Sequence, residues 1–191
     1  MKGMRPLTDQ EIEQVFAKLG DKRKRYAARN KLLFIFGLKT GLRITEILSV
    51  KVSDVATNGV VNKTVYIQRK HLKGKKEGRI LPLHDDIKPL IRHWIKKANL
   101  KPEDYLFKSQ RTGKQMTREG VHRLFKRVYH LLGLEGSIGL HGMRKKFAKN
   151  IFERTGNNIL AVQRALGHSN VATTLAYLEP SQDLVNSAIL A

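Results

Sequence analysis

The stretch GLHGMRKKF, residues 139–147, places His141 and Arg144 three positions apart in a segment with helical patterning. On a helix these two positions share a face, so the imidazole and the guanidinium can point at one object. Two more cations, Lys145 and Lys146, follow directly. The pair alone also fits a surface helix with solvated basic side chains, so the surrounding sequence has to decide between the two interpretations.

The charge balance of the chain indicates a polyanionic partner. Lys and Arg number 37 against 16 Asp and Glu, which gives a formal net charge of +21. Such an excess repels itself unless a polyanion neutralises it, and a domain this basic has the electrostatic footprint of a nucleic-acid-binding protein. The basic residues are spread over the whole chain rather than gathered in one amphipathic segment, which argues against a membrane surface. We therefore expect nucleic acid as the partner.

Length and composition favour one soluble domain over residues 1–191. A chain of this size can bury its own core, and no internal repeat or domain-scale linker divides it. Cysteine is absent, which excludes disulfides and cysteine nucleophiles and fits the reducing cytoplasm. The longest apolar run, residues 32–38, is far shorter than the roughly 18 residues of a membrane span, and residues 1–6 lead into no secretory apolar region.

Periodicity and capping signals predict an α+β fold that is mainly α-helical. Thr8 and Glu11 form a capping box that opens a helix running to about Leu19. Gly41 ends a second helix, because glycine tolerates the left-handed conformation found at helix ends. Two β-branched or apolar runs at 60–67 and 79–83 predict a small antiparallel sheet. The predicted helices span residues 8–19, 26–39, 42–48, 85–98, 117–132, 140–154, 158–166 and about 170–178, and a short amphipathic tail follows at 181–190.

Three further motifs give the pair at 141 and 144 a context. Arg43 follows the helix-ending Gly41 and precedes Glu46 by three residues. His168 lies in Leu-Gly-His-Ser-Asn, residues 166–170, and Tyr177 follows it by nine positions. The order of Arg, basic hairpin, His-x-x-Arg, Gly-His and Tyr resembles the tyrosine recombinases, the phage-integrase-like enzymes, from about residue 7 to residue 178. This resemblance predicts a tyrosine recombinase-like catalytic domain with a small antiparallel β-sheet.

The resemblance implies a binding site for one scissile DNA phosphate. In that family, Arg43 and Arg144 would bind the phosphate and stabilise the charge that develops on it, and Glu46 would orient Arg43. A guanidinium suits this role because it presents a planar fork of donors and stays charged at any working pH. Arg43 could instead simply pair with Glu46 at a helix start, although the two interpretations are compatible.

The same resemblance assigns the remaining chemistry to two histidines and a tyrosine. Tyr177 would be the nucleophile that forms a 3′-phosphotyrosyl bond and releases a 5′-hydroxyl. His141 would be the proton acceptor or hydrogen-bond partner, and His168 would support the phosphate and the tyrosine. A phenol with a pKa of about 10 needs such neighbours at neutral pH. His168 could alternatively be a helix-entry residue, and no metal or other cofactor is implied.

The family also uses a hairpin lysine that protonates the leaving 5′-oxygen. Counting back from the strand 79–83 favours Lys73 over Lys75 and Lys70. All the hairpin lysines could instead meet DNA phosphates or solvent. Family members often carry His where Lys145 stands, which predicts altered contacts with the DNA backbone. The expected backbone-contacting residues are Lys70, Lys75, Lys76, Arg118 and Lys145.

The sequence is compatible with more than one function. The favoured function is site-specific recombination or integration on double-stranded DNA. A type IB topoisomerase-like enzyme would share the chemistry but only relax DNA, and a non-catalytic nucleic-acid-binding protein could share the scaffold. The amino-terminal helical domain usual in the family is expected to be absent, either in a minimal recombinase or in an excised domain. The tail is expected to mediate self-association through its apolar residues Leu184, Val185, Ala188 and Ile189.

Overall fold

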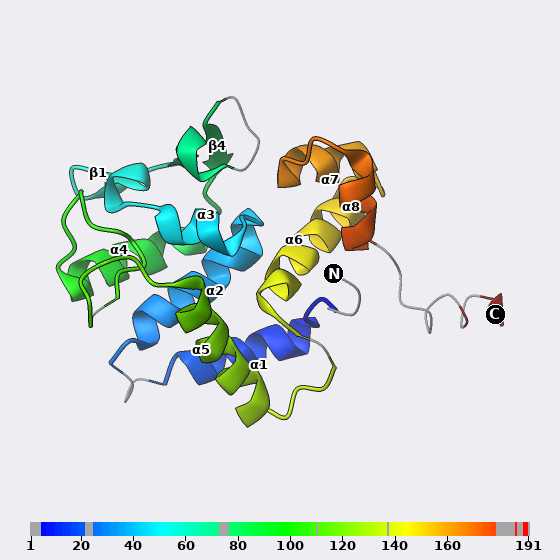
Figure 1. Ribbon diagram of the computed structural model, residues 1–191, viewed down its shortest axis with the longest axis horizontal. Helices are drawn as coiled ribbons and strands as arrows, with labels where there is room; N and C mark the ends of the chain where they lie inside the picture. Colours follow the sequence, from blue (N-terminus) through cyan, green and yellow to red (C-terminus); the bar gives the residue numbers. More distant parts are fainter. Residues whose placement is uncertain are drawn as a thin grey trace.

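The computed structural model describes residues 5–21, 25–72, 77–109, 111–136, 138–178, 186 and 189–190. It confirms the predicted mainly helical α+β fold, with small antiparallel sheets on one side (Figure 1). None of the described helices is long and apolar enough to cross a membrane. The helices are α1 (Asp9–Leu19), α2 (Ala27–Thr40), α3 (Ile44–Ser49), α4 (Ile87–Ala98), α5 (Arg118–Leu131), α6 (Leu140–Arg154), α7 (Ile159–Leu166) and α8 (Val171–Leu178).

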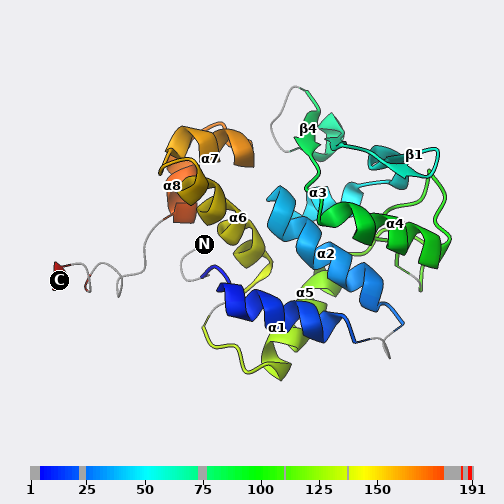
Figure 2. The same cartoon turned by 180° about the vertical axis from the view of Figure 1, so that it is seen from behind.

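Helix α2 forms the centre of the main hydrophobic core. Its side chains Leu32, Leu33, Phe34 and Phe36 are all fully buried, which is typical of a helix surrounded by other elements. It packs against α1, α4 and α6, and these neighbours surround it in both ribbon views (Figures 1 and 2). The ring of Phe34 lies 5.8 Å from that of Phe125 on α5, centroid to centroid. This core holds the end of α2 in a fixed place.

A left-handed glycine turns the chain from α2 into α3. Gly41 has a φ of 59°, and its amide donates to the carbonyl of Gly37. A Cβ added at Gly41 would lie only 2.2 Å from the Phe147 ring of α6. Both the backbone conformation and the close packing therefore require glycine. The turn brings Arg43 to the start of α3, beside α6.

The predicted strand at 60–67 is wrong in one respect: it is two strands in two separate hairpins. β1 (Ala56–Thr57) pairs with β2 (Val60–Val61), whereas β3 (Thr64–Ile67) pairs with β4 (Arg79–Pro82). The chain changes partners at residues 62 and 63, because the Asn62 amide donates to Val55 while the Lys63 carbonyl accepts from Leu83. The first hairpin turns through Asn58 and Gly59, both with positive φ. That pair is the usual signal for a tight hairpin turn, and it was present in the sequence.

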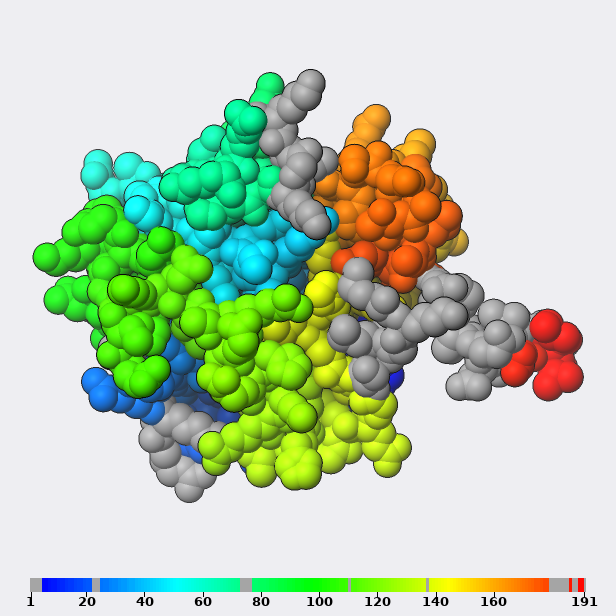
Figure 3. Space-filling model, viewed as in Figure 1, coloured from blue at the N-terminus to red at the C-terminus, as the bar shows by residue number. Residues whose placement is uncertain are grey.

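The carboxy-terminal helices have a small apolar cluster of their own. Ala148 of α6, Val162 and Leu166 of α7, and Tyr177 of α8 form this cluster. Helices α7 and α8 lie beside α6 and away from α4 in both ribbon views (Figures 1 and 2). The described residues near the C-terminus lie at the right-hand edge of the space-filling view (Figure 3), and Ile189 is 75% exposed. The other three tail residues expected to mediate association, Leu184, Val185 and Ala188, lie outside the described residues.

Candidate active site

Arg43 is held at the start of α3 by a buried carboxylate. The Glu46 side chain accepts from the Arg43 guanidinium and from the Arg43 backbone amide, each at 2.8 Å. Glu46 is only 1% exposed, and both of these bonds are made to Arg43. The Arg43 side chain is 37% exposed, which leaves its outer edge open to an incoming group. Glu46 thus orients an arginine whose free donors face solvent.

Arg144 carries a buried positive charge on α6. It is 2% exposed, and its guanidinium donates to the carbonyls of Gly41 and Leu166, the latter at 3.0 Å. Its third contact is with the Nε2 atom of His168 at 2.9 Å. Burial lowers the pKa of Arg144, yet a guanidinium stays protonated at neutral pH. Its Nε atom has no hydrogen-bond partner among the described residues, and none of those residues forms a salt bridge with it.

His168 joins Arg144 to the tyrosine helix. A guanidinium can only donate, so Nε2 of His168 accepts, and the neutral ring carries its proton on Nδ1. Nδ1 lies 3.0 Å from the hydroxyl oxygen of Thr174 on α8 and can donate to it. The His168 ring centroid is 5.2 Å from that of Tyr177, and Arg144 Cζ is 5.6 Å from the Tyr177 centroid. These contacts place His168 between Arg144 and the α8 residues Thr174 and Tyr177.

His141 lies in the first turn of α6 and is half-buried. Burial lowers its pKa, and the positive charges of Arg144, Arg118 and Arg43 lower it further. The ring is therefore neutral at neutral pH and can accept a proton or a hydrogen bond. His141 also lines a cavity of about 420 Å³ beside the start of α5. The cavity residues are Ile44, Arg118, Glu119, His122, Arg123, Gly139, Leu140 and His141.

Arg79 of β4 is a site neighbour that sequence reasoning missed. Its guanidinium donates to three carbonyls at the end of α7, those of Arg164, Ala165 and Leu166. Arg43, Glu46, Arg79 and Gly167 line one cavity of about 220 Å³, together with Leu72, Glu77, Gly78 and Leu166. The sequence marked Arg79 only as a strand residue, because nothing local connects it with a helix more than 80 positions away.

Of the expected DNA-contacting residues, Arg118 lines the same cavity as His141, and the charges of Arg118 and Lys145 both act on the His141 ring. Lys70 and Arg118 are exposed, on the short turn at 69–71 and at the start of α5, and Lys145 is half-buried on α6. The predicted general acid Lys73 and its neighbours Lys75 and Lys76 lie outside the described residues. Their roles therefore stay predictions from the sequence.

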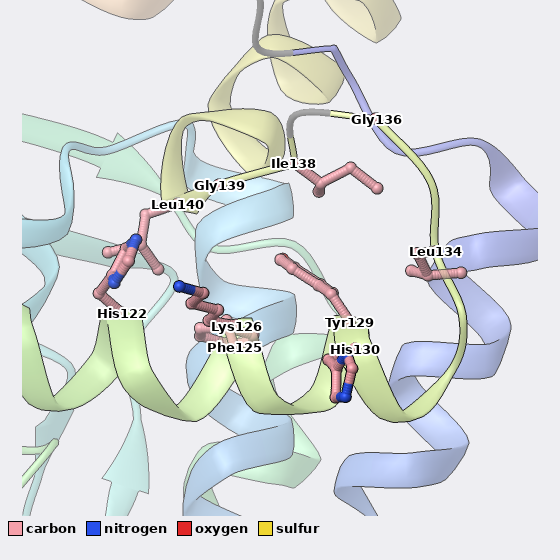
Figure 4. Close-up of a pocket in the computed structure, with 10 residues that line it drawn as sticks. All are labelled: His122, Phe125, Lys126, Tyr129, His130, Leu134, Gly136, Ile138, Gly139 and Leu140. Atoms are coloured by element: carbon pink, nitrogen blue, oxygen red, sulfur yellow. The ribbon is translucent and has the colours of Figure 1, made fainter.

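A further cavity, of about 360 Å³, lies between α5 and the segment before α6 (Figure 4). The hydroxyl of Tyr129 there is buried without a hydrogen-bond partner among the described residues, and burial raises its pKa. None of the predicted catalytic side chains that the structure describes, those of Arg43, His141, Arg144, His168 and Tyr177, lines this cavity. Its lining consists of His122, Phe125, Lys126, Tyr129, His130, Leu134, Gly136, Ile138, Gly139 and Leu140.

Comparison with known proteins accounts for this arrangement. The family model described as "Phage integrase family" matches residues 5–183. The chain belongs to the phage integrase family. Among relatives of this integrase-family chain, the probable integrase/recombinase YoeC of Bacillus subtilis is 35% identical over 179 residues, covering 94% of this chain and 91% of the relative. Tyrosine recombinase XerD of Oceanobacillus iheyensis is 32% identical over 157 residues, covering 79% of this chain and 50% of the relative.

Solved structures give the same family picture. The site-specific recombinase XerH, bound to palindromic difH substrate in a post-cleavage complex, superposes with a TM-score of 0.74 at 26% identity. That match covers 97% of this chain and 52% of the XerH chain. XerA recombinase, at 20% identity and a TM-score of 0.75, supports the fold alone. The chain thus spans about half the length of several relatives that it matches, and most of YoeC.

Proposed function

We propose that this integrase-family chain cleaves and rejoins double-stranded DNA as a site-specific recombinase or integrase, through a covalent 3′-phosphotyrosyl intermediate at Tyr177. The observation that carries the proposal is the buried Arg144 guanidinium, whose contacts are two carbonyls, a neutral histidine and the tyrosine ring. Among the described residues no carboxylate forms a salt bridge with this buried cation, and a phosphate oxygen would compensate its charge. The integrase and recombinase names of the relatives support the same activity.

The proposed reaction assigns one step to each of these side chains, and the role of Lys73 comes from the sequence alone. The Tyr177 hydroxyl oxygen attacks the scissile phosphorus, and its proton passes to neutral His141. The bond from phosphorus to the 5′-oxygen breaks, and Lys73 gives that oxygen a proton. Arg43 and Arg144 donate to the non-bridging oxygens, where charge develops in the transition state. The phosphotyrosyl bond keeps the energy of the phosphodiester, so a 5′-hydroxyl can reverse the reaction without ATP.

Replacement of the tyrosine hydroxyl tests this proposal. The target sequence is first selected by the protein from a random DNA pool. The substrate is a duplex of that sequence with a nick near the cleavage site, so that the short fragment released by cleavage diffuses away and the adduct accumulates. We expect the wild type to form a denaturation-resistant protein–DNA adduct and Tyr177→Phe to form none, with DNA affinity within about twofold, because only the attacking oxygen is lost. Tyr105→Phe, on a loop before α5, is the matched control. An adduct that survives in Tyr177→Phe would exclude Tyr177 as the nucleophile.

We propose one catalytic domain over residues 1–191, action on DNA in the cytoplasm, and self-association through the apolar tail. Ile189 is 75% exposed, which is compatible with a contact to a second copy. Light scattering with and without the selected DNA tests this association, and Ile189→Asp is expected to weaken it.

A further inference from the structure

Arg79 connects two parts of the molecule that otherwise have separate hydrophobic cores. Its strand, β4, packs with the main body, where the β4 residue Leu81 belongs to the large core. Its guanidinium reaches the last turn of α7, whose Leu166 belongs to the small cluster with Tyr177. A cation at a helix C-terminus meets both the free carbonyls and the negative end of the helix dipole. Arg79 therefore fastens the tyrosine-bearing lobe to the body at one point.

One carbonyl links this contact to the candidate phosphate site. The Leu166 oxygen accepts from Arg79 at 3.1 Å and from Arg144 at 3.0 Å. The same nitrogen of Arg144 also contacts His168. A shift of the Leu166 peptide would therefore move Arg144 and His168 together. The geometry of the site depends on where Arg79 holds that peptide.

The contact between Arg79 and the end of α7 leaves no room for a side chain at residue 167. Gly167 has a φ of 69°, and a Cβ added there would lie 2.7 Å from an Arg79 guanidinium nitrogen. The residue is thus glycine both for its left-handed conformation and for the close approach of Arg79. Gly167 directly precedes His168, so a shift of the backbone at Gly167 would also displace His168.

We propose that Arg79 is a positioning residue, which sets Arg144, and through it His168, for phosphoryl transfer by holding the Leu166 carbonyl that Arg79 and Arg144 share. It acts through that carbonyl and not on the phosphate itself. This inference rests on the proposed strand-cleavage activity. It predicts that loss of Arg79 slows the chemical step while leaving DNA affinity unchanged.

The test separates the rate of adduct formation from DNA binding, on the same nicked duplex. At saturating DNA and well below the melting temperature, Arg79→Gln should slow adduct formation by about 10- to 100-fold, the range that a small misplacement of reacting groups produces. Its Kd for DNA should stay within about twofold. Arg79→Lys should recover most of the rate, because an ammonium can still donate to the helix-end carbonyls.

Arg29→Gln is the matched structural control. Arg29 is a buried arginine that, like Arg79, donates to a backbone carbonyl, that of Lys108 at 3.1 Å within the main body. The Arg29→Gln variant should have a lower melting temperature, but at assay temperatures where it is folded it should form the adduct at the wild-type rate. If both variants slow the reaction equally, Arg79 contributes only to general stability and the proposal is overturned.

A double-mutant cycle gives an independent test. Gly167→Ala should slow adduct formation when Arg79 is present, because the new methyl group clashes with the guanidinium. The same substitution should slow it less in the Arg79→Gln background, because the shorter glutamine side chain removes the clash. Additive effects would overturn the proposal. A weaker Kd with a smaller salt dependence in Arg79→Gln would also overturn it, since Arg79 would then be a phosphate contact. If the wild type itself forms no adduct, the proposed function fails instead.

Discussion

Arg144 illustrates how a single residue can combine a structural and a chemical role. Its guanidinium joins the Gly41 turn, the end of α7 and His168, so it fixes three segments around one charge. Lysine could not replace it, because one ammonium group lacks the planar fork that reaches two carbonyls and a histidine nitrogen at once. The cost of burying this charge is borne by the free protein and would be relieved when a phosphate binds.

The neutral state of His141 leads to a pH prediction. Burial and the neighbouring arginines lower the pKa of His141 from the ordinary histidine value of 6.5. The ring therefore starts to gain a proton only at a pH below that value. We expect the rate of adduct formation to stay constant as the pH falls from 8 to about 6.5 and to decline only below that, as His141 becomes protonated. The measurement is the single-turnover rate against pH at saturating DNA. His141→Ala should be slow and should lack this decline, whereas His130→Ala should keep it.

The assignment of Lys73 predicts a substrate-specific rescue. If Lys73 protonates the leaving 5′-oxygen, a sulfur at that position removes the need for an acid, because a thiolate leaves without protonation. Lys73→Ala should therefore be slow on ordinary DNA and substantially recover on the 5′-bridging phosphorothioate. Arg144→Ala should not recover, since it acts on the non-bridging oxygens. Rescue limited to Lys70→Ala or Lys75→Ala would move the role to that lysine.

At the scale of elements, the start of α1 is stabilised by an ion pair. Arg5 donates to Glu11, with one contact at 2.7 Å, and the Thr8 amide donates to the same carboxylate at 2.8 Å. The hydrogen bond from Arg5 is the main reason why the pKa of Glu11 falls from 4.5 to about 2. Because Arg5 also donates to the Glu135 carbonyl, this pair ties α1 to the segment after α5.

Acid should therefore destabilise the protein partly through Glu11. A lowered folded-state pKa means that the stabilisation is fully present above about pH 4.5 and is lost as the pH falls toward 2. After allowance for solvent screening, we expect about 1–2 kcal/mol of unfolding free energy to disappear over this window. Urea unfolding at pH 2.5 to 6 measures it. Glu11→Gln should flatten the dependence, and the exposed Glu13→Gln should not.

The elements also show which structural features the sequence could reveal. Helices with local end signals were predicted well, because the Thr8 capping box and the left-handed Gly41 are formed by neighbouring residues. The hairpin at residues 56–61 was missed although Asn58 and Gly59 indicate it, because the adjoining apolar run was read as one strand. Arg79 could not be found, since its partners lie 85 to 87 positions away and are backbone atoms with no sequence signature.

For the molecule as a whole, the net charge of +21 predicts binding dominated by phosphate contacts. The logarithm of the DNA affinity should fall linearly with the logarithm of salt concentration, by about 0.9 for each phosphate neutralised. Arg118 lies at the exposed start of α5. Arg118→Ala should reduce the magnitude of this slope by about 0.9, the amount expected for one lost phosphate contact. Lys97→Ala, on α4 at the side remote from α8, is the control (Figure 1). Filter binding at several salt concentrations measures both, and a flat salt dependence would contradict nucleic-acid binding.

The division of buried apolar residues into two clusters has a consequence for local unfolding. The small cluster contains Tyr177, whereas Leu32, Phe34 and Phe125 belong to the large one. Cooperative units of a protein open with different free energies, and a unit with few buried contacts opens first. The α7–α8 lobe should therefore exchange its amide hydrogens sooner than α2. A molecule with that lobe open would keep most of its folded, basic surface but lack a nucleophile, so it would occupy DNA without cutting it.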